Sequence, residues 1–189
     1  MKKTNCRLIS ILMISALLAI LPATTVIAAK ATITAKSTIS KESGGGSSGG
    51  DSRLNHLNNE MLVKMNGLRS DVGVGNLSMD SSLIGIAAVR AVEASTKWSH
   101  TRPDGSQGCD MIPGNKWRGE NLSYVTYSDF DYSDGEQDEA AEVMFKNLVA
   151  SPTHYDNMVF KSFTKVGIDT NVLTSSDGIR LTTAYLFSN

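Results

Sequence analysis

Two histidines and one glutamate in short, distinctive segments are the residues best suited to chemistry. His100 lies in WSHTRPDG, Glu120 in RGENL and His154 in SPTHYDN. A carboxylate beside an imidazole favours the charged imidazolium and orients the ring. Two neutral imidazoles with a carboxylate could instead hold zinc and leave a coordination position open. In a third use, Glu120 or His154 would act as a base towards a serine hydroxyl or a bound water.

Each of these residues also has an ordinary explanation. His100 could complement the carbonyl end of a helix, His154 could be exposed in a first helical turn, and Glu120 could be a solvated charge beside a strand. The candidate nucleophiles, Ser99 and Ser151, carry no signature of activation, and Ser151 is explained as a helix cap. The residues therefore favour a binding site over a hydrolase, and leave both open.

Two amphipathic patterns precede His100. Apolar residues recur at steps of three and four over 53–71, which predicts a helix. A second helix is predicted over 82–98, capped by Asp80 or Ser81. Because the second is apolar around much of its circumference, we expect it to be the more buried of the two. It ends near Trp98, so His100 should lie just beyond its C-terminus.

The other candidate residues fall in the second half of the chain. Residues 118–127 alternate enough to predict a strand carrying Glu120, and 138–151 predict a third helix. A short helix from Ser151 and Pro152 carries His154, and 163–187 predict a hairpin with its turn at 174–178. All aromatic residues lie between Trp98 and Phe187, so aliphatic helices should pack on an aromatic-rich sheet in a layered α/β domain.

The N-terminal region reads as a leader and a spacer. Residues 1–29 have a basic start, an apolar run and small residues, which predicts a signal peptide cleaved after Ala28 or Ala29. Residues 30–51 are rich in Ser, Thr and Gly and predict a flexible linker. The mature protein is expected to be secreted, monomeric and without a stable membrane anchor. It would keep Cys109 as its one cysteine, so no intramolecular disulfide is expected.

Charge excludes one class of partner. The leader holds three of the 18 basic residues, so the mature chain has 15 basic against 19 acidic residues, a net charge of −4. A nucleic-acid partner is therefore not expected. The acidic run from Asp129 to Glu142 lacks the glycine and glutamate that a calcium loop needs at its sixth and twelfth positions. It is interpreted as a solvated loop leading into a helix.

The order of the segments SHTRPDG, GENLSY, SPTHYDN and FTKVGI resembles the CAP superfamily, the cysteine-rich secretory, antigen-5 and pathogenesis-related proteins. The resemblance covers 52–189 and is greatest to the bacterial secreted branch. It implies a three-layer α–β–α sandwich with a mainly antiparallel sheet and a groove lined by His100, Glu120 and His154. Glu142 matches a further glutamate of that branch, while Ser151 and Ser162 stand where eukaryotic members have a second glutamate and histidine.

The expected function is therefore a secreted, non-catalytic CAP domain. Its groove would bind an extracellular small apolar molecule, a peptide or a cell-wall component, with Tyr124 and Tyr127 as wall residues. A divalent metal, zinc, held by His100 and His154 is an open option, and no other cofactor is expected. The alternatives are a metal-assisted or peptidase-like hydrolase using the same groove, and a tethered protein-interaction module.

Overall fold

The computed structural model describes residues 6–7, 51–114 and 117–189. The predicted signal peptide and linker lie outside the described residues, apart from 6–7 and Asp51. The elements in chain order are β1 (Cys6–Arg7), η1 (Ser52–Leu54), α1 (Asn55–Asp71), β2 (Ser78–Met79), α2 (Ser81–Thr96), η2 (Gly108–Met111), β3 (Arg118–Tyr127), α3 (Asp134–Ala150), α4 (Pro152–Met158), β4 (Lys165–Ser175) and β5 (Gly178–Ser188). No helix among the described residues is long and apolar enough to cross a membrane.

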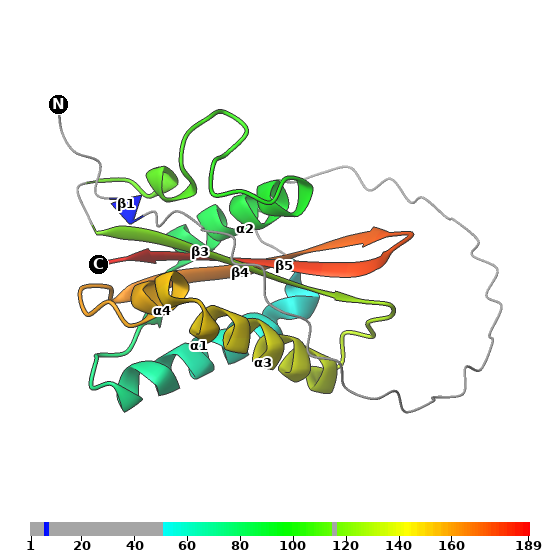
Figure 1. Ribbon diagram of the computed structural model, residues 1–189, viewed down its shortest axis with the longest axis horizontal. Coiled ribbons are helices and arrows are strands. Elements are labelled where there is room, and N and C mark those ends of the chain that lie inside the picture. Colours follow the sequence, from blue (N-terminus) through cyan, green and yellow to red (C-terminus); the bar gives the residue numbers. More distant parts are fainter. Residues whose placement is uncertain (1–5, 8–50, 115–116) are drawn as a thin grey trace. The chain divides into compact units, whose positions relative to one another are not determined.

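The expected three-layer sandwich is confirmed (Figure 1). The sheet has the order β1-β3-β5-β4-β2, and its long strands β3, β5 and β4 pair antiparallel. The two short edge strands pair parallel, β1 with Arg118–Gly119 of β3 and β2 with β4. Helix α2 covers one face of the sheet, and α1, α3 and α4 cover the other (Figure 1).

The helix pair α1 and α3 makes the larger core. Leu54, Leu57, Met61 and Met65 recur on one side of the first helical segment and are fully buried against the sheet. The stripe predicted from the sequence is therefore the packing face of α1. The same cluster takes in apolar residues of α3, α4, β4 and β5, among them Met144, Leu148, Met158, Phe163, Ile168 and Phe187.

Helix α2 begins at its predicted cap, and small side chains form its packing face. Asp80 accepts hydrogen bonds from the backbone N–H groups of Ser82 and Leu83. Six of the 16 residues of α2 are buried, against five of the 17 of α1, so α2 is slightly the more buried of the two helices, as expected. Its apolar surface is not wholly covered, since Val89 and Val92 are 41% and 52% exposed. The helix packs through the small side chains Ala87, Ala91 and Ala94, which let the backbone approach the sheet closely.

A glycine of β4 permits this approach. A Cβ atom added to Gly167 would lie 2.1 Å from the carbonyl carbon of Leu83 in the first turn of α2. Because two atoms cannot come so close, any other residue would push the helix away from the sheet. Small residues on both α2 and β4 therefore fix the distance between the helix and the sheet, and with it the position of Arg90.

The cysteine expectation applies only to a chain without its leader. In the full chain Cys109, in η2, is fully buried and disulfide-bonded. The expectation for the cleaved chain, with Cys109 as its one cysteine and no intramolecular disulfide, stays a prediction.

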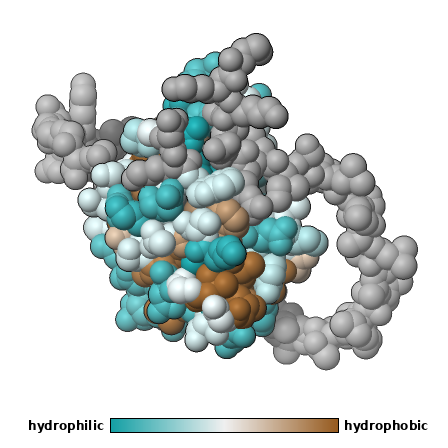
Figure 2. All heavy atoms as spheres, turned by 90° about the vertical axis from the view of Figure 1, so that its left-hand side faces the viewer, coloured by the Kyte–Doolittle hydropathy of each residue, from teal (hydrophilic) through white to brown (hydrophobic). Residues whose placement is uncertain are grey.

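The surface is mostly polar, with local apolar areas. On the face seen from the left of Figure 1, apolar side chains gather in one area among hydrophilic ones (Figure 2). Large apolar side chains that are at least one-third exposed are Val63, Val72, Val89, Val92, Trp98, Trp117, Tyr124, Val143, Val149 and Leu173.

Candidate functional site

His100 and Glu120 are brought together by the chain segments on one face of the sheet. Helix α2 ends at Thr96, so His100 follows it as predicted. The turn after it is closed by a hydrogen bond from the Gly105 N–H to the Arg102 carbonyl, and Gly105 has a φ of 85°. Glu120 lies on β3, and its Oε1 is 2.7 Å from Nδ1 of His100.

A buried arginine holds the glutamate in place. Arg90, in the middle of α2, donates from Nε to Oε2 of Glu120 at 2.7 Å and from Nη2 to Oε1 at 3.2 Å. Both side chains are only 1% exposed. Such a bidentate pair fixes the orientation of the carboxylate, because both of its oxygens accept from one planar guanidinium.

The ion pair continues outward through a second glutamate. Glu93 accepts from Nη1 of Arg90 at 2.5 Å and from Nη2 of Arg102 at 2.9 Å. These two arginines lower the pKa of Glu93, against the opposing effect of its burial. Arg102 also donates to Asp104 in the proline turn. The turn that follows His100 is therefore tied to α2 by charges.

His154 approaches the same place from the opposite face of the sheet. Its ring centroid lies 6.4 Å from that of His100. Burial, and secondly the nearby His100, lower the pKa of His154, so its ring is neutral near pH 7. The backbone of α4 is anchored here by Asn121, whose Nδ2 donates to the His154 carbonyl at 2.9 Å.

A groove lies beside these residues at the edge of the sheet. It has a volume of about 360 Å³ and is lined by Trp98, Leu122, Ser123, Tyr124, Asn147, Leu148, Ser151 and His154. Leu122, Ser123 and Tyr124 are consecutive in β3, and consecutive strand residues face opposite sides. The groove therefore contacts the edge of the strand itself, where the two faces of the sheet meet.

Aromatic rings and a cation form one end of the groove. Trp98 and Tyr124 contact edge-to-face with centroids 4.9 Å apart, and they are 42% and 46% exposed. The guanidinium of Arg180 lies 4.0 Å from the Tyr124 ring centroid and 5.6 Å from that of Trp98. Trp, Tyr and Arg are the residue types enriched in binding hot spots.

Two expected groove residues lie elsewhere. Tyr127 is three residues after Tyr124, so it points to the other face and packs into the core beneath α1 and α3, beside Phe130. Glu142 lines a separate pocket between α1 and α3, where it accepts from Lys64 at 2.6 Å. The structure thus groups His100, Glu120, His154 and Tyr124 but neither Tyr127 nor Glu142.

The histidine pair does not make a three-ligand metal centre. Both oxygens of Glu120 accept from Arg90, and one of them also contacts Nδ1 of His100. The carboxylate is therefore engaged, and only two imidazoles would remain as ligands. Within the described residues, three metal-ligating groups come within 4.8 Å of one another at His56, Glu60 and Asp138 instead.

Three important residues were not identified from the sequence. Arg90 is the one basic residue of α2 and follows a run of apolar residues, which is a signal for a buried ion pair. Trp98 was assigned only to the end of α2, although it lies two residues before His100. His56 had no distinctive local context, and its contacts come from residues about 80 positions away.

Comparison with known proteins agrees with this architecture. A model of the cysteine-rich secretory protein family (CAP) matches residues 62–185. No match was found among curated proteins. The chain is similar in structure to an outer surface protein of Borrelia burgdorferi, with 16% identity, coverage of 72% of this chain and 94% of that chain, and a TM-score of 0.55.

Two further solved structures share the fold. An extracellular protein with an SCP domain from Bacillus anthracis is 18% identical over 71% of this chain and 41% of that chain, with a TM-score of 0.52. The CAP domain of enterococcal PrgA is 16% identical over 71% of this chain and 60% of that chain, with a TM-score of 0.51. At these identities the likeness concerns the fold, whereas the family model covers about two thirds of the sequence. The chain therefore belongs to the cysteine-rich secretory protein (CAP) family.

Proposed function

We propose that this CAP domain is a secreted binding module that holds an extended peptide in the groove beside β3. The observation that carries the proposal is that three consecutive residues, Leu122, Ser123 and Tyr124, line the groove. From Asn121 onwards β3 pairs only with β5 within the described residues, so another strand could pair with its outer edge there. An extended peptide can pair with such an edge and place alternate side chains in flanking pockets.

The side chains around the edge suit this mode. Trp98 and Tyr124 offer exposed aromatic surface for an apolar or aromatic peptide side chain, with Arg180 as the polar contact. On the other side of the strand, His154 and Asn147 provide hydrogen-bonding groups. Such a mixture favours a peptide over a purely apolar molecule, which would leave these polar groups unpaired.

The ion pairs favour binding over catalysis. A general base needs an accessible lone pair and a pKa near the working pH. Glu120 accepts from Arg90 with both oxygens, so its lone pairs are already engaged. Ser151 lies in the groove, but its hydroxyl contacts Thr153 at 3.2 Å rather than a histidine. Glu120 and His100 thus act as the rigid floor beside the groove.

Selection from a phage-displayed random peptide library tests the proposal. Selected peptides should bind the purified protein, and Trp98→Ala and Tyr124→Ala should each weaken the affinity by about tenfold or more. Val72→Ala, at a similarly exposed residue that does not line the groove, serves as the matched control and should bind as the wild type does. N-methylation of alternate peptide amides should abolish binding, since it removes the hydrogen bonds to the strand.

Three results would reject or replace the proposal. Failure to select any peptide, or selected peptides that bind both aromatic variants normally, would reject the groove as the site. Cleavage of bound peptides, lost in His154→Ala, would favour the hydrolase instead.

A further inference from the structure

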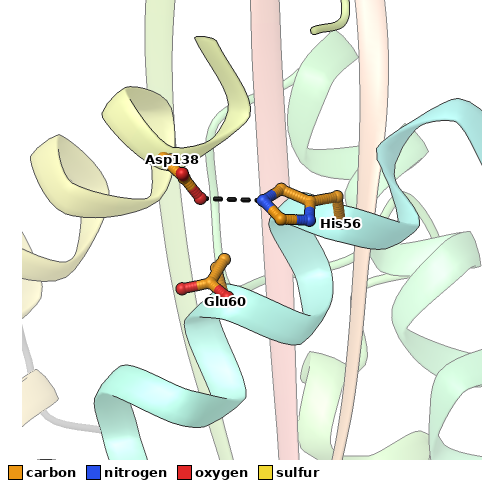
Figure 3. Close-up of side chains that lie close together, drawn as sticks. All are labelled: His56, Glu60 and Asp138. Atoms are coloured by element: carbon orange, nitrogen blue, oxygen red, sulfur yellow. Dashed lines mark hydrogen bonds and ion pairs between the residues drawn. The ribbon is translucent and has the colours of Figure 1, made fainter. Parts of the chain in front are cut away.

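We infer that His56, Glu60 and Asp138 form a site for a divalent transition-metal ion that links α1 to α3. This inference is independent of the peptide groove and shares no residue with it. The three side chains converge from two neighbouring helices in Figure 3, with His56 and Glu60 on α1 and Asp138 on α3.

The backbone places the two α1 ligands together. His56 and Glu60 are four residues apart, so their side chains lie on the same face of the helix, one turn from each other. Asp138 reaches the same point from α3, and one ligand atom from each residue lies within 4.8 Å of the others. Nε2 of His56 is already 2.8 Å from Oδ1 of Asp138. A metal ion would need only small side-chain rotations to insert between them.

The charges around the cluster favour a cation. Within the described part of the chain, the Glu60 carboxylate makes no hydrogen bond or ion pair, and the lysine one turn further, Lys64, is engaged by Glu142. Asp134 adds a further negative charge, with Oδ1 3.8 Å from Nδ1 of His56. Apart from the imidazole, the cluster thus has no positive partner among the described residues.

Asp134 would orient the imidazole ring of His56 when a metal ion is bound. A metal-bound histidine usually donates its second ring N–H to a carboxylate, which fixes the tautomer and the direction of the ring. Asp134 stands on the Nδ1 side of His56, while Glu60 and Asp138 supply the oxygens for an ion at Nε2. The arrangement therefore contains both three ligands and the outer partner of the histidine.

The donor set selects the class of metal. Imidazole suits Zn²⁺ and its neighbours in the first transition row, whereas Ca²⁺ and Mg²⁺ prefer all-oxygen sites. One nitrogen and two oxygens leave a fourth position for water around a tetrahedral Zn²⁺. We therefore expect Zn²⁺ to bind and Ca²⁺ and Mg²⁺ to bind much more weakly.

The position of the site gives it a mechanical consequence. Helices α1 and α3 run side by side in the same direction, with His56 and Asp138 in their early turns (Figure 1). The pocket that contains Glu142 lies towards their other ends, lined also by Leu68, Phe145 and Val149. An ion bound in the early turns would fix the distance between α1 and α3, the two helices that form the walls of that pocket.

Calorimetric titration of the purified protein with Zn²⁺ tests the site. The wild type should bind one ion through this cluster. His56→Gln should abolish that binding. Loss of an outer-shell partner typically weakens metal affinity by about 10–100-fold. Glu60→Gln and Asp138→Asn each remove a direct ligand and should weaken the Zn²⁺ affinity by at least this much. His154→Gln is the matched control, because it removes a histidine of the groove and should leave the Zn²⁺ affinity unchanged. Circular dichroism checks that every variant is folded.

A stability measurement provides the second readout. Zn²⁺ should raise the melting temperature of the wild type and of His154→Gln but not of His56→Gln. The inference is overturned if wild type shows no Zn²⁺ binding, if His56→Gln binds as tightly as wild type, or if binding is lost in His154→Gln instead. Equal affinity for Ca²⁺ would also overturn it, since an exposed acidic surface would then explain the binding.

Discussion

Nε of Arg90 lies 2.7 Å from Oε2 of Glu120, and both side chains are almost completely shielded from water. This contact joins α2 to β3 and, through Oε1 of Glu120, sets the orientation of His100. The candidate site therefore depends on a residue of the helix layer that never reaches the groove.

Removing the arginine should destabilise the protein strongly. Arg90→Met leaves Glu120 as a buried charge without its partner, which typically costs about 3–5 kcal/mol. Urea unfolding measures the loss. The double variant Arg90→Met/Glu120→Leu should recover part of it, because it removes both charges. Lys146→Gln, at an exposed ion pair with Glu142, is the control and should change little. A single and a double variant of equal stability would contradict the role given to the pair.

A glycine beside this pair should tolerate no side chain. A Cβ on Gly108 would lie 1.8 Å from Oε2 of Glu120 and 2.4 Å from Nε of Arg90. Gly108→Ala should therefore displace the ion pair and cost about 1–3 kcal/mol or more. Gly67→Ala is the matched control: no atom lies within 4 Å of its added Cβ, and it sits in α1. That variant should gain up to about 1 kcal/mol in the free energy of unfolding. Similar effects of the two changes would show that the predicted clash is absent.

His154 should make stability depend on pH in the acidic range. Burial and the nearby His100 lower its pKa in the folded protein, so the unfolded chain binds the proton more readily. Its contribution to stability is therefore complete above the unfolded pKa of about 6.5 and is lost as the pH falls. Urea unfolding from about pH 8 to about pH 5 should show a steeper loss for the wild type than for His154→Gln. Identical pH profiles would exclude this effect.

Asp169 should act in the opposite direction. Burial raises its pKa to about 6, and its Oδ2 has no hydrogen-bond partner among the described residues. The folded state therefore holds the proton that the unfolded chain has lost, so stability falls as the pH rises through about 4 to 6. Asp169→Asn should raise the free energy of unfolding at about pH 8 by up to about 3 kcal/mol. At pH values below about 4 the variant and the wild type should be alike. Equal stabilisation at both pH values would point to another cause.

Local sequence patterns determined the elements of this fold. The stripe from Leu54 to Leu68, the Asp80 cap, the strand 118–127 and the terminal hairpin all occur close to their predicted positions. They are predictable because spacing, capping and turn residues act over a few positions of the chain. The ordered motifs around His100, Glu120 and His154 were likewise enough to indicate the family.

Some site residues could be predicted from short sequence motifs, whereas the role of others depends on how the helices and strands pack. His100 and Glu120 could be paired from their motifs, but the role of Arg90 depends on which side of α2 faces the sheet. The small side chains Ala87, Ala91 and Ala94 face the sheet, whereas the larger Val89 and Val92 are partly exposed. Tyr124 and Tyr127 lie on opposite faces of the sheet, because successive residues of a strand alternate between the two faces and these residues are three positions apart.

What the sequence determined by itself is thus the set of elements and the motif residues they carry, because these follow from short-range chemistry. Only the tertiary structure decided that Glu142 stands apart from the groove, that Trp98 and Arg180 frame it, and that Asp138 meets His56. Such contacts join positions about 80 residues apart, and they arise when whole helices and strands pack on one another. The separation of these residues along the sequence does not predict how close they lie in the folded protein.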